Sequence, residues 1–194
     1  NDEFPFYFVQ LSSYGAYQNS NEGSDWAELR EAQTLTLQLP KTGMAVTTDI
    51  GDPKDIHPTN KQDVGKRLAA VALKNVYQKD LLHSGPMLDA AQFEKDRAVL
   101  RFQFTGSGLV AKDKFGYLKG FEIAGDDRVF HYAKASIEGD RVIVQHPKGI
   151  RPVSVRYAWA NAPVDANLFN AEGFPACPFR TDDWEGVTVR GRFE

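Results

Sequence analysis

The stretch DPKDIHPTNKQDVGKRL, residues 52–68, contains a histidine two residues after an aspartate. Imidazole titrates near neutral pH, so His57 is a candidate general base that takes a proton from a hydroxyl group. Such a base needs a carboxylate that fixes its tautomer and stabilises the imidazolium, and Asp55 is the first candidate. Asp49 and Asp52 are rival carboxylates close by. The pattern therefore indicates acyl-transfer chemistry, with a nucleophile still to be found.

A simpler explanation of the same pattern is a pair of solvated loop residues before a helix. Pro58 disfavours the helical conformation at His57, which places this histidine in the loop under either interpretation. The other histidines fit structural roles better. His83 lies at a predicted helix end, where it would interact with the helix dipole. His131 and His146 lie in or beside predicted strands.

Three further groups of residues are weaker candidates for a site. Trp26, Arg30 and Gln33 suit a carbohydrate cleft, but packing of a helix on a sheet explains them better. The segment FRTDDW, residues 179–184, lacks the further carboxylates of a calcium loop and is interpreted as a turn. Cys177 is the only cysteine, so neither an internal disulfide nor a structural zinc site is available to it. We expect a buried, inert thiol and no metal or cofactor.

The composition narrows the class of protein. The chain has 194 residues, of which 42% are hydrophobic and 25% charged, enough for a sizeable core. A net charge of −3 without any basic block gives no case for nucleic acid. No apolar run reaches the length of a membrane span, and no signal peptide is recognisable. The sequence begins abruptly on an apolar strand without methionine, so we expect that residues before Asn1 were removed or belong to another piece of the polypeptide.

The elements that would position the histidine follow from the spacing of apolar residues. Residues 4–11 form a continuous apolar run, typical of a strand covered on both faces. Asp25 and Glu28 mark a helix start. The expected inner face of this helix comprises Trp26, Leu29 and Ala32. Residues 44–50 form a second buried strand, which completes a βαβ unit with a parallel sheet.

The next helix fixes the place of the histidine. Thr59 and Gln62 form a capping box, and the helix should run to about Tyr77. Its apolar face is expected to comprise Val64, Leu68, Val71 and Ala72. Asp55 and His57 therefore lie between the carboxyl end of a strand and the amino end of a helix, where open α/β sheets bind ligands.

Period-two alternation replaces helical spacing from Arg97 onward. In AVLRFQF the residues Ala98, Leu100, Phe102 and Phe104 share one face. Further strands are predicted at residues 121–124, 129–137, 141–145 and 153–159, with a hairpin turn at residues 138–140. Such strands favour an antiparallel β-sandwich. The boundary is placed near residues 82–92, which gives domains 1–82 and 83–194.

Several long stretches, in order along the chain, resemble a known family. They are FPFYFVQLSSY, WAELREAQ, GMAVTTDIGDPKDIHPTNKQDVGKRLA, GYLKGFEIAG, VRYAWAN and NLFNAEGFPACPFRTDDW. Together they resemble the sialate O-acetylesterase-like carbohydrate esterases of the SGNH (GDSL-like) hydrolase superfamily, and the likeness covers essentially the whole chain. It implies an α/β fold, with part of a flavodoxin-like three-layer SGNH domain followed by the antiparallel β-sandwich.

The resemblance also implies roles for residues. Family members remove acetyl groups from sugar hydroxyls without a metal, using a serine nucleophile, oxyanion donors and a histidine from the last sequence block. Only that last block has a match here, with His57 as general base and Asp55 as its orienting carboxylate. Many members place the aspartate three residues before the histidine, where this chain has Lys54. The choice among Asp55, Asp52 and Asp49 therefore stays open.

No Gly-Asp-Ser nucleophile block lies upstream of the histidine. The serines after the first strand do not match it, Gly-Ser-Asp at residues 23–25 has the wrong order, and Gly-Ser-Gly at residues 106–108 indicates a turn. The unmatched serines are Ser12, Ser13, Ser20 and Ser24. We therefore expect an earlier segment of the same esterase, as a partner of this chain, to supply the serine. Two parallel apolar strands also need neighbouring strands and covering helices.

The resulting hypothesis is a carbohydrate O-acetylesterase acting on sialate or on a plant polysaccharide such as xylan or xyloglucan. A periplasmic or extracellular location is expected. The alternative is a non-catalytic carbohydrate-binding or structural β-sandwich module with an exposed aromatic platform. Its candidate residues are Tyr117, Tyr132, Tyr157 and Trp159. Alternating strands normally bury such aromatics, which favours the esterase.

Overall fold

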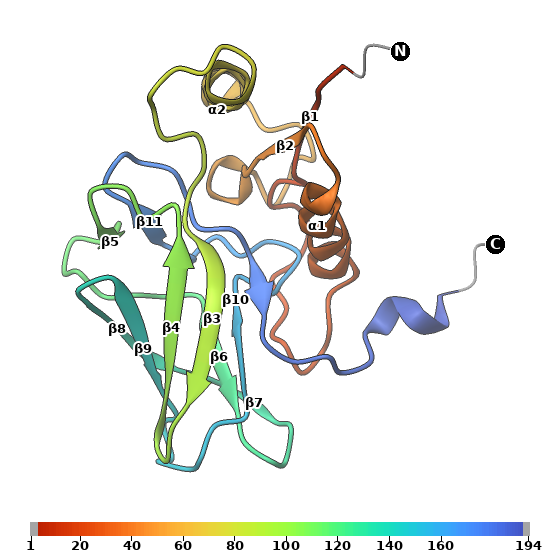
Figure 1. The fold of residues 1–194 in the computed structure, drawn as a ribbon. Coiled ribbons are helices and arrows are strands. Elements are labelled where there is room, and N and C mark those ends of the chain that lie inside the picture. Colours follow the sequence, from red (N-terminus) through yellow and green to blue (C-terminus); the bar gives the residue numbers. More distant parts are fainter. Residues whose placement is uncertain (1–3, 192–194) are drawn as a thin grey trace.

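The computed structural model describes residues 4–191. Its first part combines a pair of parallel strands with two helices (Figure 1). The elements are β1 (Phe6–Val9), α1 (Asp25–Leu35), η1 (Thr36–Gln38), β2 (Thr42–Ala45), η2 (Thr48–Ile50) and α2 (Lys61–Asn75). The predicted parallel pairing is confirmed, with Phe6 opposite Thr42 and Val9 opposite Ala45. Both helices contact this pair or its flanking segments, α2 lying against both strands.

Side-chain caps start both helices, one residue away from the predicted positions. The Ser24 hydroxyl accepts a hydrogen bond from the Ala27 backbone N–H at the start of α1. The Asn60 side chain accepts one from the Asp63 N–H at the start of α2, in place of the predicted Thr59 cap. Each cap satisfies a backbone donor that the first turn of a helix leaves unpaired.

The inward face of α1 differs from the predicted one. The buried residues of this helix are Ala27 and Arg30, whereas Leu29 is half exposed and Ala32 is exposed. The buried side chain on this face is therefore Arg30, whose guanidinium binds backbone carbonyls, and not Leu29 as predicted. In α2 the prediction holds in part: Val71 is fully buried, whereas Val64, Leu68 and Ala72 are half-buried. Arg67, which apolar spacing did not assign to this face, is the other buried residue.

Strands dominate the chain from Met87 onward. They are β3 (Met87–Phe93), β4 (Arg97–Gln103), β5 (Leu109–Ala111), β6 (Phe121–Ala124), β7 (Phe130–Tyr132), β8 (Lys134–Glu138), β9 (Arg141–Gln145), β10 (Ser154–Tyr157), β11 (Leu168–Asn170) and β12 (Phe179–Arg180), followed by η3 (Val187–Arg190). Two antiparallel four-stranded sheets have the orders β3-β4-β9-β8 and β12-β10-β6-β7, and β11 pairs with β5.

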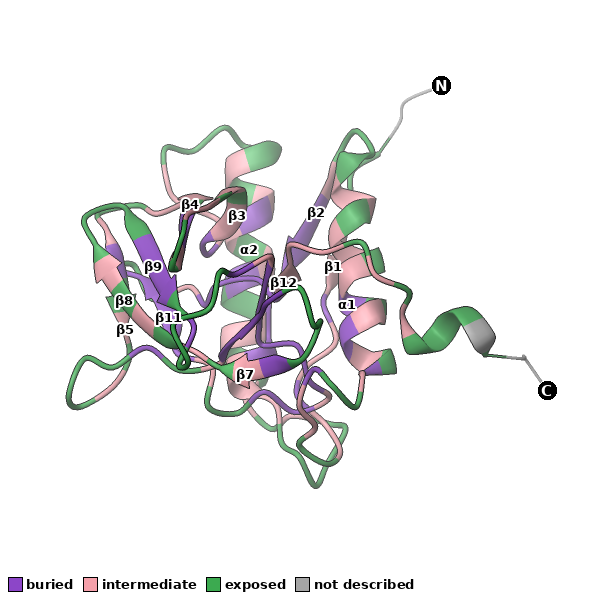
Figure 2. Cartoon of the chain, turned by 90° about the horizontal axis from the view of Figure 1, so that it is seen from below, coloured by how far each residue is buried: buried purple, intermediate pink, exposed green. Residues whose placement is uncertain are grey.

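The two large sheets face one another across a shared apolar core, as in a β-sandwich. Leu100 and Val144 come from one sheet, and Ile123 and Val155 from the other, and all four are fully buried. Figure 2 shows buried residues along β9 and β2, whereas α1 carries intermediate and exposed residues beside its few buried ones. The fold is thus mixed α/β with several antiparallel sheets.

Two strand predictions need correction. Residues 129–137 form two strands because the chain changes sheets at Ala133, so that β7 pairs with β6 and β8 with β9. Phe104 lies beyond β4 with a positive φ of 57°, outside the strand face that alternation assigned to it. The turn at residues 138–140 is confirmed, with Gly139 at positive φ.

The domain division at residues 82 and 83 stays a prediction, and its outermost residues, 1–3 and 192–194, lie outside the described part of the chain. Between residues 4 and 191, no helix has the length and apolar character needed to cross a membrane.

Candidate functional site

The candidate histidine lies in a turn between η2 and α2. The Asp55 N–H donates to the Asp52 carbonyl (3.2 Å), and the His57 N–H donates to Oδ1 of Asp55 (2.8 Å). The same Oδ1 lies 3.2 Å from Nδ1 of His57. Backbone and side-chain contacts to one carboxylate oxygen thus set the direction of the imidazole ring.

This geometry has electrostatic consequences. The backbone N–H of His57, followed by its ring, lowers the pKa of Asp55, so this carboxylate stays ionised. A carboxylate at Nδ1 favours the tautomer that carries its proton on Nδ1 and leaves Nε2 as the acceptor. Nε2 has no hydrogen-bond partner within residues 4–191. The arrangement is chemically able to take a proton from a hydroxyl group placed at Nε2.

The two rival carboxylates have other partners. Asp49 forms a bidentate ion pair with Arg67, with N–O distances of 2.6 and 2.7 Å, and both side chains are about nine-tenths buried. Asp52 accepts a hydrogen bond from the Lys54 N–H (2.9 Å). Asp55 is therefore the carboxylate that the structure brings to His57. The catalytic roles of these two residues stay predictions.

Neighbouring segments hold the turn in place. The Gly15 N–H donates to the Pro53 carbonyl (2.9 Å), and the Ser13 hydroxyl donates to the Thr48 carbonyl (2.7 Å). A side chain at Gly51 would overlap the Ser13 backbone, which shows how closely the two segments approach. The turn is thus fixed at its base, while the His57 side chain above it is 83% exposed.

The hydroxyls of Ser13, Ser20 and Ser24 have structural partners, and no upstream serine contacts His57 in the described chain. Ser13 binds the Thr48 carbonyl, Ser20 donates to the Glu122 carboxylate, and Ser24 caps α1. Ser107 donates to Glu172 within a turn, as the Gly-Ser-Gly pattern predicted.

The three weaker site candidates have structural roles. Trp26 donates to the Ser12 carbonyl, and Gln33 accepts from the Leu11 N–H. Cys177 is buried, and burial raises the pKa of its thiol. In FRTDDW, Asp182 forms a buried ion pair with Arg156. No group of three or more potential metal-ligating side chains gathers within residues 4–191.

The remaining histidines contact aromatic rings. His83 lies beyond the end of α2 at Asn75, so the predicted interaction with the helix dipole is wrong. Its ring is 5.3 Å from Phe104, and burial lowers its pKa. The rings of His131 and His146 contact each other at 5.0 Å, in agreement with structural roles.

The aromatic platform of the alternative hypothesis does not form as predicted. Tyr157 is buried and its hydroxyl accepts from the Leu168 N–H, and Trp159 is only 3% exposed. Tyr117 and Tyr132 are exposed, and Tyr132 lines a cavity whose lining does not include Tyr117. The other polar residues of that cavity gave no signal in the sequence, because they come from distant segments.

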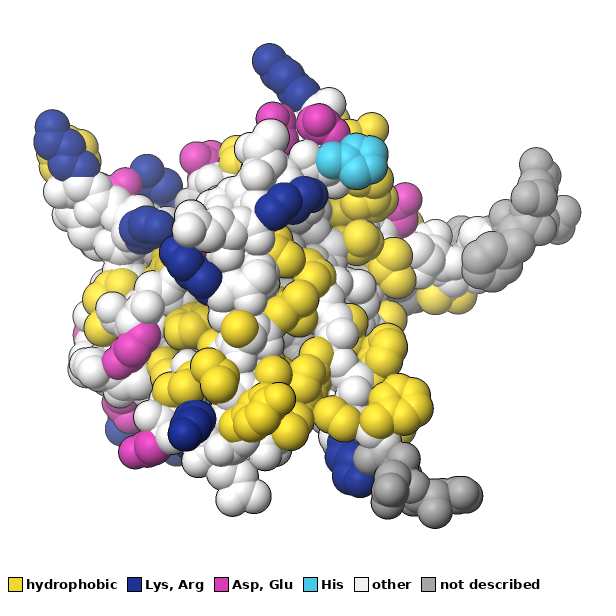
Figure 3. Space-filling view, turned by 90° about the horizontal axis from the view of Figure 1, so that it is seen from above, with side chains coloured by type: hydrophobic (Ala, Val, Ile, Leu, Met, Phe, Trp, Pro, Cys, Tyr) yellow, Lys and Arg dark blue, Asp and Glu magenta, His cyan; other side chains and the backbone are white. Residues whose placement is uncertain are grey.

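Exposed apolar side chains mark the face that carries β1 and α2. Phe6 of β1 is 57% exposed, so the expectation of a strand buried on both faces is wrong for the described chain. Leu73 and Tyr77, at the end of α2, are also exposed. Figure 3 shows hydrophobic side chains gathered on this face. Such a patch is typical of an interaction surface.

Comparison with known proteins finds similar curated sequences and a similar solved structure. No family model matches the chain. It is 30% identical over 196 residues to the sialate O-acetylesterase of Mus musculus, covering 91% of this chain and 35% of the mouse protein. The sialate O-acetylesterase of Rattus norvegicus is 39% identical over 95 residues, which cover 43% of this chain and 17% of the rat protein.

A solved structure supports the same relationship. A carbohydrate acetylesterase from Xanthomonas citri matches 93% of this chain with a TM-score of 0.88 and 50% sequence identity. The match covers 41% of the Xanthomonas chain, so the present chain spans well under two thirds of the length of its relatives.

Proposed function

Because this chain is related to part of the sialate O-acetylesterase-like carbohydrate acetylesterases, we propose that it belongs to an enzyme that removes acetyl groups from sugar hydroxyls. The observation that carries the proposal is the contact between Asp55 and Nδ1 of His57 in a turn that follows a parallel strand. In open α/β sheets, this edge is where ligands bind.

In the proposed mechanism, His57 is the general base of serine acyl transfer. A serine Oγ attacks the acetyl carbonyl while Nε2 of His57 takes the hydroxyl proton. The imidazolium, stabilised by Asp55, then gives this proton to the departing sugar oxygen. Water then attacks the acetyl-serine while His57 takes one of its protons. As the bond between the acetyl carbon and Oγ breaks, the imidazolium returns that proton to Oγ, which restores the serine and releases the acetyl group as acetic acid. Asp55 holds the ring throughout and keeps its charge.

We propose that the serine and the oxyanion donors lie on an earlier segment of the polypeptide, as part of a flavodoxin-like SGNH domain. Two observations support this. The hydroxyls of Ser13, Ser20 and Ser24 are engaged elsewhere, and the face around Phe6 and Leu73 exposes apolar side chains. A two-stranded parallel sheet requires further strands and covering layers. That segment would pair with the free edge of β1.

The proposed substrate is an O-acetylated carbohydrate, either sialate or a plant polysaccharide such as xylan or xyloglucan. A periplasmic or extracellular location agrees with such a substrate. Release of acetate from each of these acetylated carbohydrates, measured side by side with the full-length protein, would select among them.

Replacement of the histidine tests the mechanism. We expect His57→Ala in the full-length protein to lower the turnover of p-nitrophenyl acetate by several orders of magnitude, because the serine loses its base. Stability should hardly change, since this side chain is largely exposed. Asp55→Asn should lower turnover less, and Asp52→Asn, whose carboxylate does not contact the ring, is the matched control.

Two results would contradict this proposal. Near-normal hydrolysis by His57→Ala would show that His57 is not the general base. Hydrolysis by the 194-residue chain alone, abolished by a serine-directed inhibitor, would show that the nucleophile does not come from another segment.

A further inference from the structure

A second concave site lies on the β-sandwich, apart from the histidine turn. It is a cavity of about 330 Å³, at the lower end of the range for small-molecule sites. Tyr17 comes from the segment after β1, Glu122 from β6, Tyr132 from β7, and Trp159 and Asp165 from the segment after β10. The proposed acetyl transfer uses none of these residues.

Two tyrosines form an aromatic rim at the cavity mouth. Tyr132 is 61% exposed and Tyr17 is 47% exposed, whereas Phe121 and Trp159 in the lining are buried. Burial and a hydrogen bond with Tyr132 raise the pKa of Tyr17, so its hydroxyl stays neutral. Exposed aromatic faces of this kind can stack on the C–H face of a sugar ring, while their hydroxyls remain hydrogen-bonding groups.

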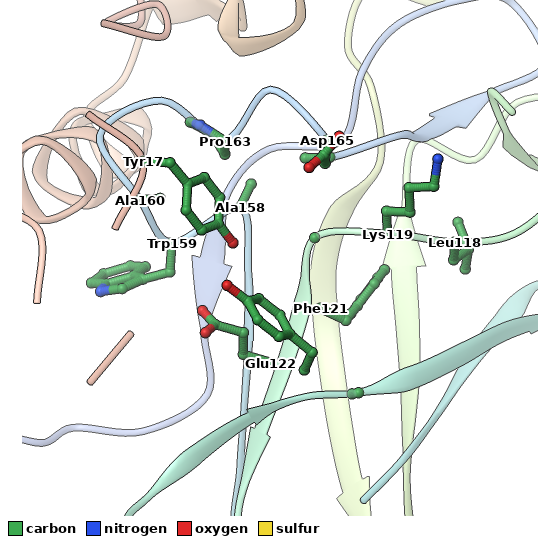
Figure 4. A pocket seen from close by; sticks show the side chains of 14 residues that line it. Tyr17, Leu118, Lys119, Phe121, Glu122, Ala158, Trp159, Ala160, Pro163 and Asp165 are labelled. Carbon is green, nitrogen blue, oxygen red and sulfur yellow. The ribbon is translucent and has the colours of Figure 1, made fainter. Parts of the chain in front are cut away.

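The cavity contains two acidic side chains that can accept hydrogen bonds. The Glu122 carboxylate is held by the Ser20 N–H and hydroxyl, and Figure 4 shows it facing the same space as the Tyr17 hydroxyl. Asp165 adds a second carboxylate. Both suit the hydroxyl donors of a carbohydrate.

The charge distribution selects against an anionic ligand. Among residues 4–191, Lys119 is the only cation that lines the cavity, and its ammonium donates to Asp113 at 2.7 Å. Its side chain also points away from Glu122 (Figure 4). A carboxylate or phosphate in this cavity would meet the Asp165 carboxylate and the acidic side chain of Glu122, whose pKa is raised by burial, while Lys119 is already paired with Asp113.

We propose that this cavity is a binding subsite for a neutral sugar ring of the glycan on which the enzyme acts, an inference that rests on the proposed acetylesterase function. The segment that carries Tyr17 also supports the histidine turn, through the hydrogen bond from Gly15 to Pro53. A bound glycan chain would thus be held on a framework shared with His57. The assignment favours a neutral polysaccharide over sialate as substrate.

Calorimetric titration tests the subsite without requiring turnover. The full-length His57→Ala protein is titrated with two neutral probes, xylohexaose and xyloglucan heptasaccharide, and with the acidic probe sialyllactose. We expect at least one neutral probe to bind more tightly than sialyllactose. Tyr132→Ala, added to this background, should weaken that binding about tenfold, because an exposed aromatic anchor is lost.

Tyr117→Ala is the matched control, since this tyrosine is 68% exposed but lies outside the cavity lining. The affinity of the Tyr117→Ala variant for the neutral probe should stay within about twofold of that of the His57→Ala protein. Asp165→Ala, at an exposed carboxylate of the cavity, should weaken binding as well. Neither replacement leaves a buried void, and melting temperatures would verify that the variants fold.

The assignment is overturned if neither neutral probe binds, if sialyllactose binds best, or if Tyr132→Ala and Tyr117→Ala have equal effects. The outcome is separate from that of the esterase proposal. Sugar binding with full hydrolysis by His57→Ala would refute only the mechanism, whereas loss of hydrolysis without sugar binding would refute only the subsite.

Discussion

Arg30 shows how one residue joins distant parts of the chain. Its guanidinium is fully buried and donates to the carbonyls of Leu11, Ser12, Ala160 and Asn161, at 2.7–2.8 Å. Burial lowers its pKa to about 9. The loop after β1 is thereby fixed to the loop after β10, which lines the cavity. No carboxylate accompanies this cation among its hydrogen-bond partners in the described chain.

Replacement of this arginine should be costly. Arg30→Met keeps much of the side-chain length but leaves the Leu11 and Ala160 carbonyls without a donor, whereas Ser12 keeps Trp26 and Asn161 keeps the Tyr14 N–H. Each unsatisfied buried group costs about 1–3 kcal/mol, so we expect the free energy of unfolding to fall by about 3 kcal/mol or more. Urea denaturation would measure it. Arg128→Met, at an exposed arginine stacked on Trp184, is the control and should cost about 1 kcal/mol or less.

At the scale of elements, the close approach of α2 to the parallel pair depends on a glycine in β2. A side chain at Gly43 would overlap Val71 of α2 and the ring of Tyr7 in β1. We expect Gly43→Ala to destabilise the protein by about 1–3 kcal/mol through overpacking, measured as a lower midpoint of urea unfolding.

Gly65 provides a matched comparison within α2 itself. A Cβ atom there would have no neighbour within 4 Å, and the residue lies in the helix interior. Gly65→Ala should therefore stabilise the protein by about 0.5–1 kcal/mol, because alanine is the better helix former. Equal effects of the two substitutions would contradict the observed packing of α2 on β2.

The elements were predictable to the extent that their signals are local. Alternation and turn chemistry located β6, β9 and the turn between β8 and β9, and the two-residue spacing brought Asp55 to His57. The inner face of α1 was not predictable from apolar spacing, because a buried guanidinium lies where a hydrophobic residue was expected. The cavity also escaped prediction, since Tyr17, Glu122 and Asp165 meet only through tertiary contacts.

At the scale of the whole molecule, a buried ion pair connects strands within the sandwich, and a half-buried one connects the sandwich to α1. Asp182 accepts from Arg156 and from the Ser154 hydroxyl, and Arg180 of β12 pairs with Glu31 of α1. Burial alone would raise the pKa of Asp182, but the hydrogen bonds from Arg156 and Ser154 outweigh it and leave the pKa lowered.

Acid should therefore weaken the fold. An aspartate whose folded pKa is below the unfolded value of about 3.9 stabilises the protein above that pH, and the contribution disappears as pH falls through the folded pKa. We expect Asp182→Asn to lose about 3–5 kcal/mol at pH 7, where it breaks a buried pair, and to show a shallower decline of stability below about pH 4.

Urea unfolding at pH 7 and at pH 3 would measure both effects. Asp80→Asn is the control, because the Asp80 side chain is fully exposed and its contact with Lys74 is long, at 3.7 Å. An unchanged acid response in Asp182→Asn would show that other carboxylates govern acid unfolding.

The hydrogen bond from Gly15 to Pro53 has a consequence for how this protein can change during evolution. In one short stretch of chain, Gly15 binds the turn that carries His57, and Tyr17, two residues further on, lines the cavity. An insertion or deletion inside that stretch would shift the two together. Natural variants that alter its length should therefore be rare, or should carry compensating changes in both places.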